Sequence, residues 1–468
     1  MKYLVLFALL PFMGLAQEKT YRITEESYDT DLLTKDFHRG RREALRKLMP
    51  EGSVAIFFAN PVRNRNNDVD FEYAQNPDFY YLTGLMEPHS VLLVFKEELK
   101  IDGTNTNEII FVQDRNPKRE TWEGKRLGIE GVQTKLGFEK VMLNTDFSRL
   151  KLDYKKFSVI LHPINFQDIR NEEGDGDLFD LWQSFEGSTT KFSEKKSFKQ
   201  QDEIMSTLRE VKLKEELALL RKAIAITCEA ENELMRAARP GMTEYQSEAI
   251  VEFYFKHRGS EHEGYPSILG SGENSCVLHY NTNRKKFQNG DLLLSDVGAE
   301  YHGYTADVTR TFPVNGTFTN EQKLIYNLVL EAQTKGIAAC KKGNGFWEPH
   351  KAAAEVIGKG LKELGLIEDA MEYKKYFIHG TSHYLGLDVH DAGTYGPLSP
   401  GQVITVEPGI YIPEGSDCDP RWWNIGIRIE DDILITENEP ENLSAGSPRT
   451  IEAIESMMKM GSPFKAIK

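Results

Sequence analysis

The chain has 468 residues, of which 40% are hydrophobic, and a formal net charge of −15. A chain of this length is too long for a single ordinary domain with one hydrophobic core, so we expect two domains. The acidic balance argues against a nucleic-acid partner, whose phosphates require basic patches. The wide, irregular spacing of the cysteines fits neither a disulfide framework nor a zinc motif. Buried free thiols are expected for at least the first three of Cys228, Cys276, Cys340 and Cys418.

Residues 1–16 have the composition of a secretory signal peptide. A basic residue precedes an apolar run at 3–13, and Gly14 and Ala16 are the small residues of a cleavage site. The alternative is a membrane anchor, which would need roughly 20 apolar residues. We therefore expect cleavage before Gln17, export to the periplasm or the medium, and a mature chain with no membrane span.

Residues 17–175 are predicted to form an α/β domain. An amphipathic helix is expected over residues 37–49. Continuous apolar runs predict strands that are buried on both faces of a sheet, and these runs lie at residues 53–59, 90–95, 108–112 and 157–161.

The segment 76–84 of this domain, NPDFYYLTG, is unusually aromatic. The favoured interpretation is that its tyrosines cap a core and keep their hydroxyl groups in water. A contact with another subunit or with a substrate is the alternative.

A second domain is expected at residues 206–462, after a linker at 176–205. It begins with one helical pattern that runs from Ser206 to Met235. Two later helices are predicted to begin with capping boxes, at Thr243 and at Thr319.

Two aspartates, Asp296 and Asp307, interrupt otherwise apolar strand-like runs. A short turn near residue 302 predicts an antiparallel hairpin that places them nearly opposite each other. Opposed residues on one face have Cβ atoms about 4.5–5.5 Å apart. Because aspartate is depleted in strands, two unrelated turn aspartates are the weaker interpretation.

Glu407 and Glu430 also lie in apolar runs, where an unpaired carboxylate would be costly. His383 lies between two further histidines, His379 and His390. A single histidine is more often a core residue than a ligand, but this clustering favours a functional site.

These residues predict a metal site of one imidazole and four carboxylates, made by Asp296, Asp307, His383, Glu407 and Glu430. Oxygen ligands suit manganese better than metals that prefer thiolates. Four negative charges packed together require cations, and two divalent ions offset them better than one. Sites with two ions about 3.5–4 Å apart recur in hydrolytic enzymes.

Three motifs resemble those of the pita-bread metallopeptidases, and of the aminopeptidase P family in particular. They are HGTSHYLGLDVHD at 379–391, VEPGIYI at 406–412 and GIRIEDD at 426–432. Residues 76–84 are similar to the non-catalytic domain of that family. The resemblance implies a pita-bread (α+β) catalytic domain after the α/β domain. It also implies a homo-oligomer that hydrolyses the bond between an N-terminal residue and a following proline.

The resemblance further implies a dinuclear site, usually with Mn²⁺, whose bridging hydroxide is the nucleophile. Glu407 would pass a proton from water to the leaving nitrogen. His279 and His390 match positions that contact the scissile peptide and stabilise an oxyanion. His379 and Arg428 are expected to support the site, and Arg428 would orient carboxylates. Framework roles are the alternative for His279 and His379.

Two other functions remain possible at this point. A prolidase would cleave only Xaa-Pro dipeptides, so the dependence on peptide length distinguishes it from the aminopeptidase. A binding protein of the same fold would have lost metal ligands, whereas all five candidates are present; the same fact argues against a metal-free enzyme such as creatinase. The segment GSDCDPRWWN at 415–424 departs from the simplest family pattern, so the resemblance predicts the metal ligands but not the shape of the rim of the site.

Overall fold

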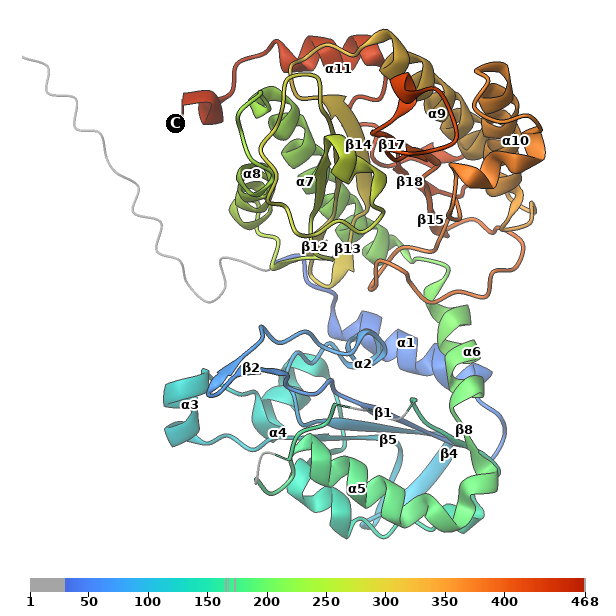
Figure 1. Cartoon of the computed structure of the whole chain (residues 1–468). Coiled ribbons are helices and arrows are strands. Elements are labelled where there is room, and N and C mark those ends of the chain that lie inside the picture. The colour runs from blue at the N-terminus through green and yellow to red at the C-terminus, as the bar shows by residue number, and fades with distance from the viewer. Residues whose placement is uncertain (1–29, 165, 167, 172–173, 467–468) are drawn as a thin grey trace, which may run out of the picture. The chain divides into compact units, whose positions relative to one another are not determined.

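Figure 1 shows a computed structural model of the chain, which describes residues 30–164, 166, 168–171 and 174–466. The predicted signal peptide at 1–16 lies outside the described residues. In the described part, no helix is long and apolar enough to cross a membrane. The four cysteines are free thiols; Cys228 and Cys340 are buried, whereas Cys276, which we expected to be buried, is partly exposed.

The N-terminal domain contains a six-stranded sheet in the order β6-β5-β4-β1-β7-β8. β4 pairs antiparallel with β1 and β5, and the remaining neighbours pair in parallel. Its strands, with the separate ribbon β2–β3, are β1 (Val54–Phe58), β2 (Asn64–Asn66), β3 (Val69–Asp70), β4 (Val91–Ile101), β5 (Thr104–Val112), β6 (Val141–Leu143), β7 (Ile160–Leu161) and β8 (Lys196–Ser197).

The sheet is covered on both faces, as its continuous apolar runs predict. Every residue of β1 is buried. Because side chains alternate along a strand, Ala55 and Phe57 pack into one hydrophobic cluster, while Val54, Ile56 and Phe58 pack into another. The two-sided burial predicted for this strand is confirmed.

The helices of this domain are α1 (Lys35–Leu48), α2 (Pro77–Thr83), α3 (Pro117–Glu123), α4 (Gly128–Gly131), α5 (Leu178–Thr189) and α6 (Phe198–Arg209). α1 corresponds to the amphipathic helix expected over residues 37–49. Its first turn is capped by Thr34, whose hydroxyl accepts from Phe37 N at 3.2 Å. α5 lies within the segment predicted as a linker. Its side chains Leu181, Trp182 and Phe185 pack into one of the two clusters.

The aromatic segment forms α2, with Asn76 as its N-cap and Gly84 in the left-handed conformation as its C-cap. Tyr80 and Tyr81 are buried. The hydroxyl of Tyr81 donates to the carbonyl oxygen of Leu208 at 2.9 Å. The expectation that these hydroxyls remain in water is therefore wrong for Tyr81, because a backbone carbonyl of α6 satisfies it instead.

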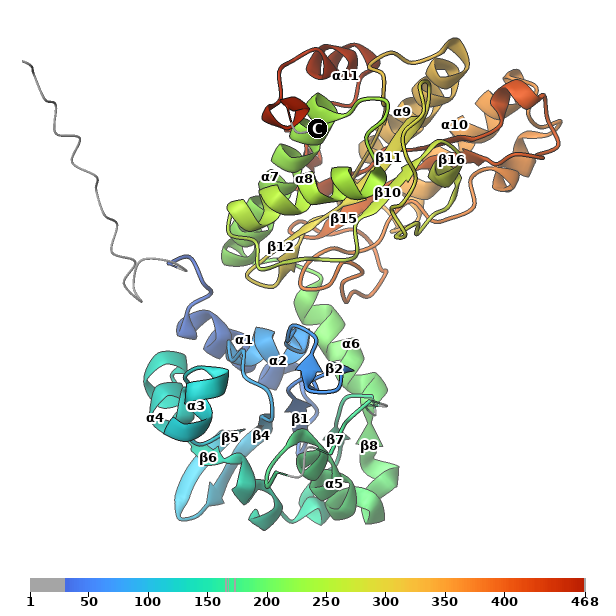
Figure 2. The same ribbon diagram turned by 60° about the vertical axis from the view of Figure 1, so that its left-hand side comes forward.

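The C-terminal domain is built from four small antiparallel sheets in the orders β10-β11-β14, β13-β12-β9, β15-β18-β19 and β16-β17. Two helix pairs, α7 with α8 and α9 with α10, lie on opposite sides of these strands (Figures 1 and 2). The strands are β9 (His262–Glu263), β10 (Ile268–Ser271), β11 (Leu292–Val297), β12 (Ala299–Tyr301), β13 (Tyr304–Thr305), β14 (Val308–Pro313), β15 (Val403–Val406), β16 (Gly409–Ile412), β17 (Ile425–Arg428), β18 (Asp431–Leu434) and β19 (Glu441–Asn442).

The helices of this domain are α7 (Lys214–Ala237), α8 (Glu244–His257), α9 (Asn320–Ala339), α10 (Glu348–Glu363) and α11 (Ile451–Met458). Both predicted capping boxes are present, at Thr243 and Thr319. The single helical pattern predicted from Ser206 is wrong, because the chain breaks between α6 and α7. The break is stabilised by a third capping arrangement, in which Glu216 accepts from the backbone N–H of Leu213 at 2.8 Å.

Candidate metal centre

The five predicted metal ligands lie at or near the ends of short strands of the C-terminal domain. Asp296 is in β11, Asp307 immediately precedes β14, Glu407 follows β15, and Glu430 lies between β17 and β18. His383 precedes the isolated bridge that Tyr384 makes with Ile404. All five line one cavity of about 600 Å³.

The predicted hairpin is present, but its register differs from the expected one. Its turn contains His302 and Gly303, both with positive φ, and it pairs Tyr301 with Tyr304. This register places Thr309, and not Asp307, opposite Asp296. A two-residue turn moves the centre of the hairpin towards the C-terminus, so the two aspartates are not directly opposed.

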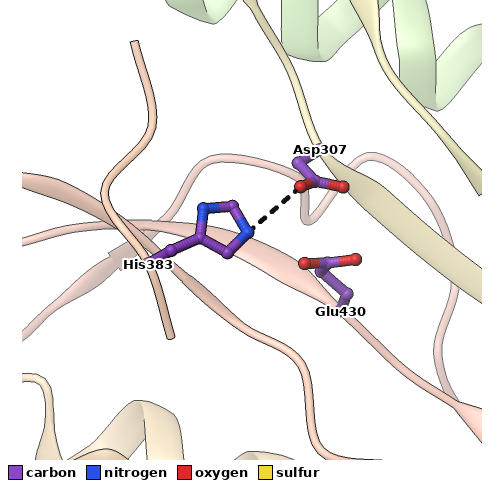
Figure 3. Close-up of side chains that lie close together, drawn as sticks. All are labelled: Asp307, His383 and Glu430. Carbon is purple, nitrogen blue, oxygen red and sulfur yellow. Dashed lines mark ion pairs between the residues drawn. The ribbon is translucent and has the colours of Figure 1, made fainter. Parts of the chain in front are cut away.

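Asp307, His383 and Glu430 converge most closely. Each offers a ligand atom, and these atoms lie within 4.8 Å of one another. Figure 3 shows the imidazole and the two carboxylates pointing toward one another. His383 Nε2 lies 3.3 Å from Asp307 Oδ2 and 3.6 Å from Glu407 Oε1, so Glu407 belongs to the same group.

Tyr265 and Arg428 join Asp296 to this group. The hydroxyl oxygen of Tyr265 lies 2.6 Å from Oδ1 of both Asp296 and Asp307, which leaves the second oxygen of each carboxylate for other partners. Arg428 donates to Oδ2 of Asp296. Thr309 holds Glu430 by donating to its Oε2 at 2.5 Å.

The hydrogen bonds of His383 fix its tautomer. Nδ1 lies 3.0 Å from the carbonyl oxygen of Tyr384. Because a carbonyl can only accept, Nδ1 carries a proton, and in the neutral ring the lone pair is on Nε2. The nitrogen that faces the carboxylates is thus the one that can bind a metal ion, and the backbone carbonyl orients it as in many histidine ligands.

The electrostatics of the group call for a cation. Burial, and then the charge of Asp296, raise the pKa of Asp307. Burial, and then Asp307 and Glu407, raise the pKa of Glu430 well above its usual range. Burial raises the pKa of Glu407 to about 7, although His383 and Arg428 oppose the shift. Burial lowers the pKa of His383, but the hydrogen bond and charge of Asp307, together with the charge of Glu407 and the carbonyl of Tyr384, outweigh it and bring this pKa to about 9.

A donor set of several carboxylates and one correctly oriented imidazole fits a hard or borderline divalent ion. Such an ion would offset the cost of burial and the mutual repulsion that raise these carboxyl pKa values. The residues present therefore fit the metal site that the sequence predicts.

His379 is held in a chain of hydrogen bonds beside this site. Arg428 donates to the hydroxyl oxygen of Tyr411 at 2.8 Å, and that hydroxyl lies 2.8 Å from Nε2 of His379. Nδ1 of His379 lies 2.6 Å from the carbonyl oxygen of Gly380, so Nε2 accepts from Tyr411. Burial, and then the charge of Arg428, lower the pKa of His379 to about 3. This imidazole is neutral and rigidly oriented, as a supporting group would be.

His279 and His390 also line the cavity, together with apolar side chains that include Ile268, Leu278 and Val389. The ring of His390 packs on that of His383, with centroids 4.2 Å apart. Both histidines are largely exposed to the cavity and the solvent. They are therefore accessible to a bound molecule and more exposed than His379, which also lines the cavity.

Three polar residues of the site were not identified from the sequence: Tyr265, Thr309 and Tyr411. Their roles depend on contacts between segments that are far apart, such as Tyr265 with Asp307 and Tyr411 with His379. Tyr411 lies within the VEPGIYI motif, which was a usable signal. Tyr265 lies in no motif that was recognised.

Comparison with known families now adds to this geometry. Residues 218–437 match the model of metallopeptidase family M24, and residues 38–156 match that of the aminopeptidase P N-terminal domain. The chain is 36% identical over 445 residues to the Xaa-Pro aminopeptidase of Escherichia coli (strain K12), which covers 92% of this chain and 98% of that protein.

Solved structures agree with these matches. The aminopeptidase PepP of Pseudomonas aeruginosa superposes with a TM-score of 0.80 at 34% identity, over 91% of this chain and 98% of that chain. A zinc-substituted aminopeptidase P of E. coli in complex with product superposes with a TM-score of 0.81 at 36% identity, over the same shares of the two chains.

The fold and the site thus define a metallopeptidase in which a pita-bread catalytic domain follows an N-terminal domain along the chain. More specifically, the chain belongs to the aminopeptidase P group of metallopeptidase family M24, and it is a hydrolase. The family predicted from the three sequence motifs is confirmed.

Proposed function

We propose that the protein is an exported aminopeptidase that removes an N-terminal residue preceding a proline, and that it uses two Mn²⁺ ions. The observation that carries this proposal is the cavity that is lined by all five candidate metal ligands together with His279, His379 and His390. Relatives named Xaa-Pro aminopeptidase support the choice of substrate.

In this proposal, Asp296, Asp307, His383, Glu407 and Glu430 hold the ions. When bound, two divalent ions supply a nucleophile by lowering the pKa of a water molecule toward neutrality. The carboxylates provide the oxygen ligands that Mn²⁺ favours, and His383 provides the nitrogen.

Glu407 is the proposed proton carrier. It lines the cavity beside His383 and His379, with Oε2 3.5 Å from Nδ1 of His379. A carboxylate at this position is able to accept a proton from the attacking water and deliver it to the leaving nitrogen. Proton transfer by a positioned side chain typically contributes about 10²–10⁴ in rate.

His279 and His390 are proposed to contact the scissile peptide. Their rings are accessible from the cavity, and an imidazole N–H near the developing oxyanion would stabilise it more than the ground-state carbonyl. His379 is assigned a supporting role, because both of its ring nitrogens are already hydrogen-bonded.

The preference for proline follows from its nitrogen, which carries no hydrogen in a peptide bond. A site that offers no acceptor at this position leaves the N–H of an ordinary peptide unsatisfied, whereas a proline peptide carries no such cost. The apolar side chains of Ile268, Leu278 and Val389 line the cavity near the histidines and would contact a pyrrolidine ring.

The test compares three peptides with protein that has been stripped of metal and then supplied with Mn²⁺. Cleavage of Ala-Pro-Ala in preference to Ala-Ala-Ala, and only after Mn²⁺ is restored, is the expected result. Equal cleavage of the two tripeptides would remove the proline assignment. Cleavage of the dipeptide Ala-Pro alone would identify a prolidase instead.

Export is proposed from the composition of residues 1–16. N-terminal sequencing of the mature protein is expected to begin at Gln17. Recovery of the correctly localised protein with an intact Met1 would contradict the proposal.

A further inference from the structure

A buried group of charged side chains lies where the chain breaks between α6 and α7. Arg209 ends α6, Lys212 follows it, and both contact Asp391, whose side chain is 1% exposed. Arg209 donates to Oδ1 of Asp391, and Lys212 Nζ donates to Oδ2 at 2.7 Å. We call these three residues the Asp391 cluster.

The two cations of the Asp391 cluster make further polar contacts with neighbouring residues. Lys212 Nζ also donates to the carbonyl oxygen of Arg209 at 2.6 Å. The guanidinium of Arg209 further contacts Asp78 of α2 at 2.7 Å and Asp388 at 2.8 Å. These contacts fix both cations, so that they hold the carboxylate of Asp391 in one position.

The fit around Asp391 is close. A Cβ atom on Gly386 would lie 2.2 Å from Oδ2 of Asp391 and 2.8 Å from Cε of Lys212. Only a glycine therefore allows this approach. The backbone N–H of Asp391 donates to the carbonyl oxygen of Tyr384 at 2.9 Å, so both the main chain and the side chain of Asp391 are anchored.

Asp391 directly follows His390 in the sequence, and His390 lines the cavity. Among the described residues, no hydrogen-bond partner of the His390 imidazole is found, and its recorded ring contact is the one with His383. The position of this imidazole consequently depends on its own backbone and on this ring contact. That backbone is fixed on one side by the anchored Asp391.

We propose that Arg209, Lys212 and Asp391 are positioning residues that hold the His390 imidazole against the substrate. The inference rests on the proposed function insofar as His390 contacts the scissile peptide. Burying two cations and a carboxylate costs desolvation free energy that pairing only partly offsets, so such groups are weak evidence for a purely stabilising role. Hydrophobic residues at these positions would stabilise the fold equally well. A role in fixing the backbone next to His390 explains why charged residues occupy them.

The test uses Lys212→Met, which removes one cation but leaves the pair of Arg209 with Asp391. A misplacement of about 1 Å can cost about 10²-fold in rate, so we expect kcat for Ala-Pro-Ala to fall about 10- to 100-fold. KM and the bound metal content should change less than about twofold. The matched control is Arg221→Met, which breaks the exposed pair with Glu441 and should retain the wild-type kcat.

A double variant separates positioning from general stability. If the Asp391 cluster acts through His390, adding Lys212→Met to His390→Ala lowers kcat no further than His390→Ala alone. Multiplicative losses in the double variant, or an unchanged kcat in Lys212→Met, would overturn the proposal. If Lys212→Met does not fold, Lys212→Gln, which keeps a hydrogen-bond donor without the charge, replaces it in the same cycle.

A crystal structure of the metal-loaded Lys212→Met protein provides a readout that is independent of activity. We expect the ring of His390 to leave its position 4.2 Å from the ring of His383 or to lose its defined density. An undisturbed ring would refute the positioning role even in a protein without peptidase activity. Conversely, a displaced ring in a protein that does not cleave Xaa-Pro peptides would refute only the proposed function.

Discussion

Replacing Asp307 by asparagine tests the metal centre through the stability of the protein without and with metal. Asparagine keeps an oxygen for the 2.6 Å contact with Tyr265 but removes a negative charge. With ligand atoms within 4.8 Å of one another, two full charges repel by about 3 kcal/mol at an effective dielectric constant of about 20. Burial and repulsion already raise the pKa values of Asp307 and Glu430, so protonation relieves part of this energy.

Asparagine also removes the negative charge that pairs with His383 at 3.3 Å, which opposes this relief. We therefore expect the metal-free Asp307→Asn protein to lie within about 1 kcal/mol of the metal-free wild type. Metal binding should separate the two proteins. At a Mn²⁺ concentration 100 times Kd, binding stabilises the wild type by about 2.7 kcal/mol. A 100-fold weaker affinity in the variant would reduce this gain to about 0.4 kcal/mol. Turnover should be abolished.

The assay is urea unfolding of both proteins with a chelator and with added Mn²⁺, together with metal analysis. Asp417→Asn, at an exposed position, serves as the matched control and should change neither quantity. An equal gain from Mn²⁺ in variant and wild type would refute the role of Asp307 as a ligand. A metal-free variant whose stability differs from that of the metal-free wild type by more than about 3 kcal/mol would refute this electrostatic balance.

Three further predictions concern catalysis, pH and assembly. Glu407→Gln should lower kcat by at least about 10²–10⁴, and a variant that keeps both ions and nearly full kcat would exclude proton transfer by this residue. Burial raises the pKa of Glu216 from 4.5 to about 7. Between these two pH values the unfolded chain binds fewer protons than the folded one, so the free energy of unfolding falls as the pH rises. This loss amounts to about 3 kcal/mol. It would be contradicted if the free energies of unfolding of wild type and Glu216→Gln differed by a constant amount from pH 4 to 8. A homo-oligomer is proposed from the family resemblance, and light scattering at micromolar concentration should detect it; a fully active monomer would count against the proposal.

The local sequence determined much of the fold. The apolar run of β1 identified a strand buried on both faces, because alternate side chains of such a run must both avoid water. Hydroxyl and glutamine side chains three residues apart identified the starts of α8 and α9, because that spacing satisfies the first free N–H groups. The carboxylates in apolar strands identified the candidate ligands, since an unpaired buried charge is costly.

Only the tertiary structure decided how these parts meet. The two-residue turn at His302 and Gly303 set a register that places Thr309 opposite Asp296, which a count from the centre of the turn did not predict. The break before α7 has no strong breaker residue, and Lys212 and Arg209 become buried there because they meet the distant Asp391. The hydroxyl group of Tyr265 lies at hydrogen-bonding distance from both Asp296 and Asp307, which are on different arms of one hairpin. Local propensity is set by neighbours in the sequence, whereas these contacts depend on segments that become neighbours only on folding.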